Sequence, residues 1–251
     1  MGGRAIMSLP IALQLYTVRD ETAKDFIGTL EKVAEIGYEG VEFAGFGDIL
    51  ASKMKEALEK LNLKAVGSHT SKELLFNKLD EVIEYNLAIG NPFVICPWDN
   101  YGSREEWLNA AKLYNGIGKK LKQRGLQFLY HNHAHEFGKF DGEYILDLIY
   151  RETDPQLVKA EIDTYWVHYA GVDPAGYVAK YGGRCPIVHL KDMNAEDKST
   201  VEVGEGIIDI KSIIEASVKA GAEWLVVEQD SCARPSLESV KISLENLKKM
   251  R

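Results

Sequence analysis

The sequence is poor in several features that define other classes of protein. Its 251 residues include three cysteines, Cys96, Cys185 and Cys232. Their odd number and wide spacing argue against a disulfide framework or a zinc cluster and fit a reducing environment. No apolar run approaches the roughly 20 residues that a membrane span needs, and residues 1–10 are too short and too weakly apolar for a secretory signal. We therefore expect a cytoplasmic protein that does not contact a membrane.

Positive charge and linker-type sequence are also scarce. Lysine and arginine total 30 against 38 acidic residues, a net charge of -8, whereas a surface that follows phosphates needs the opposite sign. Nucleic acid is thus not an expected partner. The chain has seven prolines and no Pro/Ser-rich or low-complexity tract. With 45% hydrophobic and 27% charged residues, it is typical of a folded globular protein, predicted here as one domain over 1–251 with a short N-terminal extension at 1–9.

What the sequence does contain is a repeated alternation of short apolar runs and longer amphipathic stretches. Eight apolar runs have the length and composition of strands. Amphipathic stretches such as 25–36, 71–89 and 210–220 lie between them, and four end in a glycine that is typical of a helix C-terminus, at positions 37, 90, 125 and 221. The predicted strands are 11–18, 40–44, 64–69, 93–96, 127–133, 158–163, 187–191 and 224–228.

Eight such units in this chain average about 31 residues, the usual size of a βα repeat. A doubly wound open sheet would normally carry a glycine fingerprint after its first strand, but Leu-Tyr-Thr-Val-Arg follows at 15–19. The sequence therefore predicts a single (β/α)8 TIM barrel. So small a barrel has no residues left for a second domain, and we expect specificity to come from short βα loops, with a second copy of the chain covering the rim as an open alternative.

The predicted strands end in polar residues, at the end of a TIM barrel where active sites lie. Four of the six histidines, His69, His131, His133 and His189, fall there. Because alternate residues of a strand face the same side, Glu161 shares a face with the residue at 163, and His189 with the residue at 191. A charged residue facing the barrel interior is costly unless it is paired or binds a cation.

Imidazole and carboxylate groups from four neighbouring strands suit one divalent metal ion, such as Mn²⁺, Zn²⁺, Co²⁺ or Mg²⁺. The candidate ligands are His131, Asp163, His189 and Glu228, spaced by about one βα step each. His133 could replace His131 from the same face. The alternative is that Asp163 and Glu228 cap the helices that follow them.

Together these strand ends resemble the sugar phosphate isomerase/epimerase family, the xylose isomerase-like TIM barrels that include endonuclease IV and inositol-catabolism enzymes. The resemblance implies one divalent cation held by Glu, Asp, His and Glu, which fall here on His131, Asp163, His189 and Glu228. The histidine at 131 departs from the pattern and puts two-glutamate epimerisation in doubt. The motifs that carry the resemblance are Tyr-His-Asn-His at 130–133, His-Glu-Phe at 135–137, Glu-Ile-Asp-Thr-Tyr-Trp at 161–166, Val-His-Leu-Lys-Asp-Met at 188–193, Gly-Glu-Gly at 204–206 and Val-Glu-Gln-Asp at 227–230.

The resemblance implies a sugar isomerase or epimerase acting on a keto-sugar, cyclitol or sugar phosphate through an enediolate-type intermediate. The alternative is a lyase, dehydratase or glycoside-cleaving enzyme on a 3-keto-sugar or keto-inositol, which the change at His131 favours. A repair nuclease is disfavoured by six histidines and the negative charge, and a non-catalytic sugar-sensing protein is a further alternative.

Three residues are predicted to move protons in either reaction. Glu228 is the expected base and His133 the second proton-transfer group. Lys191 either donates to an oxyanion or leaving group or pairs with Glu161. A loop arginine, Arg234, is expected in solvent. The predicted substrate-binding residues are Gln14, Glu42, His69, Trp98, Glu161 and Trp166.

Overall fold

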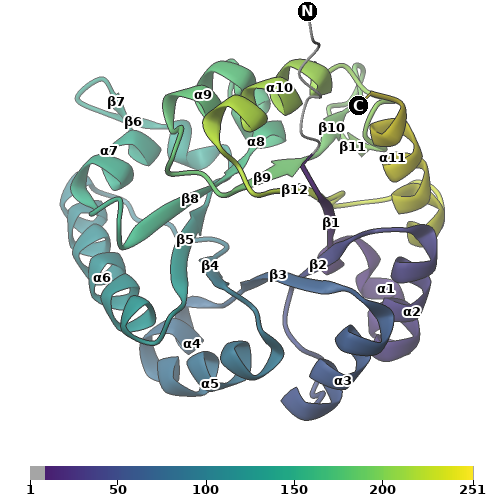
Figure 1. Ribbon diagram of the computed structural model, residues 1–251. Helices are drawn as coiled ribbons and strands as arrows, with labels where there is room; N and C mark the ends of the chain where they lie inside the picture. The colour runs from purple at the N-terminus through teal and green to yellow at the C-terminus, as the bar shows by residue number, and fades with distance from the viewer. Residues whose placement is uncertain (1–8, 251) are drawn as a thin grey trace, which may run out of the picture.

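The computed structural model describes residues 9–250, and these form a closed barrel of eight parallel strands ringed by helices (Figure 1). Each barrel strand pairs with the strands that precede and follow it in the chain, and β1 closes the ring on β12. The predicted (β/α)8 barrel is confirmed; the extension predicted at 1–9 lies outside the described residues apart from Leu9. The barrel strands are β1 (Ile11–Gln14), β2 (Gly40–Phe43), β3 (Lys64–His69), β4 (Phe93–Cys96), β5 (Gln127–His131), β8 (Val158–Asp163), β9 (Ile187–Leu190) and β12 (Trp224–Val227).

Strand alternation separates two cores. Outward residues such as Val188 and Leu225 pack against the helices in one large cluster. Inward residues form a second, smaller apolar cluster inside the barrel, with Trp224 packed against it. Above that cluster the inward positions change to polar side chains, which places the polar residues at the carboxyl ends of the strands. The inner apolar cluster consists of Ala12, Val66, Phe93, Ile95, Leu129, Ile187 and Val226.

Side-chain caps and left-handed glycines set the ends of several helices. Asp25 accepts a hydrogen bond from Gly28 N at the start of α2, and Gly37 ends that helix with a φ of 104°, a conformation that costs glycine little. The glycine stops predicted at 90 and 221 have the same left-handed conformation. The helices are η1 (Leu15–Val18), α1 (Arg19–Thr22), α2 (Phe26–Ile36), α3 (Ala51–Leu61), α4 (Lys72–Asn77), α5 (Leu79–Ile89), α6 (Arg104–Gln123), η2 (His135–Phe137), α7 (Ile145–Glu152), α8 (Thr164–Tyr169), α9 (Pro174–Lys180), α10 (Ile210–Ala220) and α11 (Ser236–Met250).

Three predicted elements are shorter than the sequence pattern indicated. The strand predicted at 11–18 ends at Gln14, because the Gln14 side chain accepts a hydrogen bond from Tyr16 N and starts a 3-10 turn. The strand predicted at 127–133 ends at His131, and His133 N donates to the buried Glu136 carboxylate. The helix predicted at 71–89 breaks at Lys78, whose φ of -137° is not helical. The hydrophobic periodicity of the sequence contains no information on these local side-chain hydrogen bonds and dihedral angles.

Two loops at the carboxyl ends of the strands carry small hairpins, so these two βα loops are longer than the short loops expected from the sequence. One hairpin pairs β6 (Lys139–Phe140) with β7 (Glu143–Tyr144), and the other pairs β10 (Asp192–Met193) with β11 (Thr200–Val201). The buried Asp192 holds the second loop by accepting from Gly204 N at 2.9 Å and Gly206 N at 3.0 Å. A Cβ at Gly206 would lie 2.2 Å from that carboxylate, which accounts for glycine there.

Within residues 9–250, no helix combines the length and apolar character needed to cross a membrane. The two ends of the described chain meet at the seam of the barrel, where α11 lies beside α2 (Figure 1). Tyr38 OH donates to Val240 O at 2.7 Å across this seam.

Candidate active site

A buried polar layer lies between the inner apolar cluster and the mouth of the barrel. Gln14, Glu42, Glu161 and His189 are inaccessible to solvent in this layer. Gln14 Nε2 donates to Glu42 Oε2 at 2.7 Å, and His69 Nε2 lies 2.7 Å from Glu161 Oε1. Every contact in the layer joins groups from different strands, so the closure of the barrel brings them together.

This layer orients two histidines in the same way. His189 Nε2 lies 2.7 Å from Glu42 Oε2, and its Nδ1 lies 2.9 Å from Glu228 Oε2. His131 Nδ1 lies 2.9 Å from Glu161 Oε1, and its Nε2 lies 3.7 Å from Asp163 Oδ2. One nitrogen of each imidazole therefore contacts a glutamate of the layer. The other nitrogen faces Glu228 in the case of His189 and Asp163 in the case of His131. A carboxylate behind a histidine sets its tautomer and ring orientation in the manner of metal sites.

Asp163 divides its two carboxylate oxygens between two tasks. Oδ1 accepts hydrogen bonds from Tyr165 N at 3.0 Å and Trp166 N at 3.1 Å and so caps α8. Oδ2 is buried and accepts no hydrogen bond from the described residues. The helix-cap alternative and the ligand prediction are thus compatible for this residue. The capped helix α8 also buries Tyr165.

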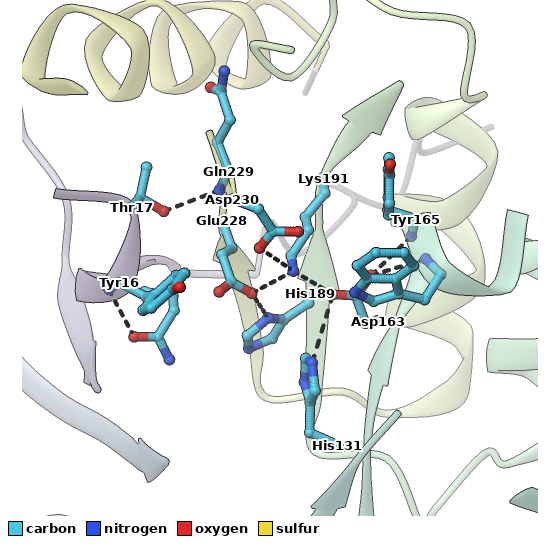
Figure 2. A network of polar contacts seen from close by, with 12 residues as sticks. Tyr16, Thr17, His131, Asp163, Tyr165, His189, Lys191, Glu228, Gln229 and Asp230 are labelled. Carbon is cyan, nitrogen blue, oxygen red and sulfur yellow. Dashed lines mark hydrogen bonds and ion pairs between the residues drawn. The ribbon is translucent and has the colours of Figure 1, made fainter. Parts of the chain in front are cut away.

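Lys191 is buried beside the same carboxylates. Figure 2 shows its ammonium between three acidic side chains, with Nζ 2.8 Å from Glu228 Oε2, 3.0 Å from Asp163 Oδ2 and 3.0 Å from Asp230 Oδ1. The alternative ion pair of Lys191 with Glu161 was therefore wrong. Lys191 and Glu161 leave from neighbouring strands, but the lysine stem extends toward the barrel mouth, whereas Glu161 belongs to the layer beneath.

The charges of the site shift its proton affinities. Burial is the largest influence on Glu228 and opposes its ionisation, but Lys191 and His189 together outweigh burial and lower the pKa of Glu228. Burial also opposes the charge on His189, yet Glu161 and Glu42 raise the pKa of this imidazole well above 6.5. Burial, reinforced by the charge of Glu42, raises the pKa of Glu161 to about 7. The site is thus a dense set of opposite charges rather than an excess of one sign.

A cavity of about 610 Å³ opens above this set. Of the residues predicted from the sequence, His69, Trp98, His131, His133, Lys191 and Glu228 line it. Gln14, Glu42 and Glu161 lie in the layer beneath its floor, where they contact other side chains. The Trp166 ring lies behind the wall, 5.3 Å from the ring of His133. Sequence reasoning did not assign roles to the other lining residues, which include Tyr16, Leu74 and Asp230.

The site defines the class of protein: a TIM barrel with an enzyme-type cavity over buried imidazole and carboxylate groups at the carboxyl ends of its strands. The chain belongs to the xylose isomerase-like TIM barrel family, whose model matches residues 30–250. The family confirms the resemblance drawn from the sequence motifs.

The sequence is similar to inosose dehydratases, and the fold is similar to that of a solved sugar phosphate isomerase/epimerase. Over 154 residues the chain is 28% identical to an inosose dehydratase of Clostridium beijerinckii, covering 54% of this chain and 51% of the relative, so it spans about half the length of that protein. An inosose dehydratase of Clostridium botulinum is 24% identical over 86% of this chain and 87% of the relative. A solved sugar phosphate isomerase/epimerase of Parabacteroides distasonis superposes with a TM-score of 0.85 at 24% identity, covering 99% of this chain and 96% of the other, which shows the fold.

The described residues fit a divalent cation. One ligand atom from each of His131, Asp163, His189 and Glu228 falls within 4.8 Å of the others, and all four side chains are buried. The set combines two imidazoles with two carboxylates, a mixture suited to Mn²⁺, Zn²⁺ or Co²⁺. Asp163 Oδ2 is buried and accepts no hydrogen bond from the described residues, and it lies 3.0 Å from the Lys191 ammonium, so a bound cation would share this carboxylate with the lysine. A second group shares two of these histidines and adds His69 and Glu161. Its single carboxylate, Glu161, lies 2.7–3.2 Å from all three imidazoles and offers less negative charge to a cation than the two carboxylates of the first group.

Replacement of Asp163 by asparagine tests its helix-capping role and its proposed metal-binding role separately. We expect Asp163→Asn to weaken Mn²⁺ binding at least tenfold, because a neutral amide replaces the buried anionic oxygen. The amide oxygen can still accept from Tyr165 N and Trp166 N, so the melting temperature without metal should fall by only a few degrees. Titration calorimetry and thermal unfolding in chelator test both parts. Unchanged Mn²⁺ affinity would remove Asp163 from the ligand set.

The pH dependence of stability should report on His133. Burial, aided by the charge of Lys191, lowers the pKa of His133 from 6.5 to about 3. Between these values the unfolded chain binds a proton that the folded chain does not, so stability is complete above pH 6.5 and is lost as pH falls toward 3. We expect His133→Gln to reduce this loss by up to one proton, about 1.4 kcal/mol per pH unit.

Urea unfolding of the chelated protein at several values between pH 4 and 8 measures this slope. His168→Gln is the matched control, because His168 lies on α8 and lines a different cavity. Equal slopes in the two variants would contradict the assignment.

Proposed function

We propose that this chain is a metal-dependent enzyme that removes the proton α to a carbonyl in a keto-sugar or keto-cyclitol. The observation that carries the proposal is the convergence of two oriented histidines and two buried carboxylates, within 4.8 Å of one another, beside a cavity of about 610 Å³. A divalent cation held by His131, Asp163, His189 and Glu228 would act as a Lewis acid toward the substrate carbonyl.

The protein's own residues supply the proton chemistry. Glu228 is ionised, lines the cavity and is the proposed base. Lys191 lines the same cavity and is protonated, because burial opposes its charge but Asp163 and Glu228 outweigh burial and raise its pKa well above 10.5. Its ammonium would pair with the basic oxygen of a departing group and protonate it. In an elimination, Glu228 takes the α proton, and the electron pair of the broken C–H bond forms the new C=C bond. The C–O bond at the β carbon breaks at the same time, and the leaving oxygen takes the proton of Lys191.

The contact between these two residues favours elimination over epimerisation. Glu228 Oε2 and Lys191 Nζ lie 2.8 Å apart, so after product release the proton on Glu228 can return directly to Lys191 and restore both groups. An epimerisation needs a second group across the cavity that exchanges protons at the same carbon. We therefore place a lyase or dehydratase ahead of the isomerase or epimerase that the sequence pattern favoured. The dehydratase names of the relatives agree with this order.

Isomerisation or epimerisation is the second candidate, and His133 is the observation that favours it. His133 lines the cavity, and its buried Nδ1 has no hydrogen-bond partner within the described part of the chain. His133 would then be the second proton-transfer group beside Glu228, as predicted from the sequence. A sugar phosphate is the less favoured substrate, because Arg234, the loop cation after β12, is paired with Glu202 at 2.7 Å and Glu205 at 3.1 Å.

Product analysis in D2O tests the proposal and separates the two outcomes. The purified protein with Mn²⁺ is incubated with a keto-inositol, a methyl 3-keto-glucoside and free ketoses, and products are followed by NMR and mass spectrometry. Elimination yields an unsaturated ketone and releases water or methanol, whereas epimerisation yields an isomer that carries one deuterium. Chelation should stop either reaction. Turnover that survives complete removal of metal, or no turnover of any keto-sugar, would refute the proposal.

A further inference from the structure

The cavity has two walls of different chemistry. The wall formed by the ends of β5, β9 and β12 carries His131, His133, Lys191 and the carboxylates. The opposite wall, formed by the ends of β1 to β4 and the start of α4, includes His69 and Ser71 and is otherwise apolar. Its residues Trp98, Tyr16 and Leu74 are 53%, 43% and 39% exposed. The lining residues of this apolar wall are Tyr16, Ala44, Gly45, Leu74, Pro97 and Trp98.

The loop that carries Trp98 is held rigidly although its indole is exposed. The next residue, Asp99, is buried and accepts hydrogen bonds from Tyr101 OH and Tyr114 OH, both at 2.7 Å, and from Lys72 Nζ at 2.9 Å. Its backbone oxygen lies 2.8 Å from His135 Nε2. None of these side chains takes part in the proton chemistry. Their joint effect is to fix the position of an apolar surface that faces the cavity.

Tyr16 is oriented on the other side of the mouth in a similar way. The Arg19 guanidinium lies 4.1 Å from the centre of the Tyr16 ring and donates to the backbone oxygens of Tyr16 and Asp230 at 2.8 and 2.9 Å. The aromatic ring at the end of β1 is thus tied to the end of β12. The Tyr16 ring, held by Arg19, and the loop of Trp98, held through Asp99, are thus positioned before a ligand binds, which lowers the entropy cost of binding.

The size of the cavity exceeds what a monosaccharide ring needs. A volume of about 610 Å³ lies in the range that holds drug-sized ligands. A sugar on the polar wall would leave Trp98 and Leu74 in contact with water. Contiguous exposed apolar side chains in a cavity usually mark the binding site of an apolar group.

We propose that the substrate is a keto-glycoside whose leaving group is an aryl or similarly flat apolar substituent, and that Trp98, Leu74 and Tyr16 bind this substituent. The inference rests on the proposed function for the polar wall. In the elimination, Glu228 takes the α proton, the C=C bond forms, the bond between the β carbon and the aryl oxygen breaks, and that oxygen leaves with the proton of Lys191. The apolar wall therefore holds the departing half of the substrate.

Binding of unreactive glycosides tests the apolar wall without requiring turnover. Phenyl and methyl β-glucoside have no carbonyl and stay intact, so their dissociation constants with the Mn²⁺-loaded protein can be measured by titration calorimetry. We expect the phenyl compound to bind at least tenfold more tightly. Trp98→Ala should reduce this preference to threefold or less, and Leu74→Ala should reduce it by a smaller factor. Leu113→Ala is the matched control, because Leu113 is 50% exposed on α6 and should leave the preference unchanged.

Two results would overturn the inference. One is equal affinity for the two glycosides. The other is a Trp98→Ala variant that keeps the phenyl preference and instead converts a dimer to a monomer in analytical ultracentrifugation, which would assign the apolar wall to a second copy of the chain. Turnover assays distinguish this failure from failure of the proposed reaction. Elimination of methyl and phenyl 3-keto-glucosides without a phenyl preference in binding would retain the reaction and reject the inference. A Trp98-dependent phenyl preference without turnover of any keto-sugar would do the reverse.

Discussion

Glu228→Gln is expected to lower kcat/KM by about a thousandfold, the scale of a lost general base. The amide cannot accept the substrate proton, and it cannot return one to Lys191 2.8 Å away. Glutamine has nearly the same shape, and its oxygen can remain near His189 Nδ1, so the fold should survive. Steady-state kinetics with a keto-sugar, together with thermal unfolding, measures both effects.

A matched variant and a metal assay make the Glu228 result specific. Glu215→Gln changes an exposed glutamate on α10 and should leave kcat/KM and stability unchanged. Because Glu228 is also a candidate ligand, bound Mn²⁺ is measured in the same samples. Near-normal turnover in a Glu228→Gln protein that still binds Mn²⁺ would show that another group removes the proton.

Lys191→Met is expected to destabilise the metal-free protein by about 3–5 kcal/mol, the usual result of removing one partner from a buried ionic group. The ammonium lies within 3.0 Å of Asp163, Glu228 and Asp230. Methionine keeps most of the apolar stem but leaves the three carboxylates without their neighbouring cation. Urea unfolding in chelator gives the change in the free energy of unfolding.

Mn²⁺ should largely restore the stability of this variant, because two of the same carboxylates belong to the proposed metal site. The variant should also bind Mn²⁺ at least tenfold more tightly than the unmodified protein, since the repulsion between the ammonium and the metal is gone. Lys241→Met on α11, where the lysine is exposed, controls for loss of a positive charge. If Mn²⁺ did not restore the stability of Lys191→Met, the lysine and the metal would not neutralise the same carboxylates.

Much of the fold follows from local patterns. The predicted strands at 64–69, 93–96 and 158–163 coincide with β3, β4 and β8, because a buried barrel strand is marked by a short apolar run and bounded by turn residues. The ends of β1 and β5 could not be predicted from periodicity. They depend on hydrogen bonds that the side-chain oxygens of Gln14 and Glu136 accept from the backbone N–H groups of Tyr16 and His133. The sequence pattern alone is equally compatible with longer strands.

The candidate site was also predictable only in part from the sequence. Strand alternation correctly grouped inward-facing residues, and the one-step spacing of His131, Asp163, His189 and Glu228 predicted the cluster that the barrel brings together. Neither the alternation nor the spacing shows how deep in the barrel each of these side chains lies. Glu161 and Asp163 share a face and differ by one repeat along the strand, yet the first supports His131 from below and the second faces Lys191.

The sequence by itself determined the barrel, the carboxyl-end location of the site and the residue types available there, because each depends on the order of residues within one βα unit. The tertiary structure alone decided which carboxylate neutralises which cation and which wall of the cavity is apolar. Lys191 reaches Asp230 across 39 residues, and Gln14 reaches Glu42 across 28. Such contacts depend on the stagger of the closed sheet and the length of each side chain, which the spacing of residues along the chain does not encode.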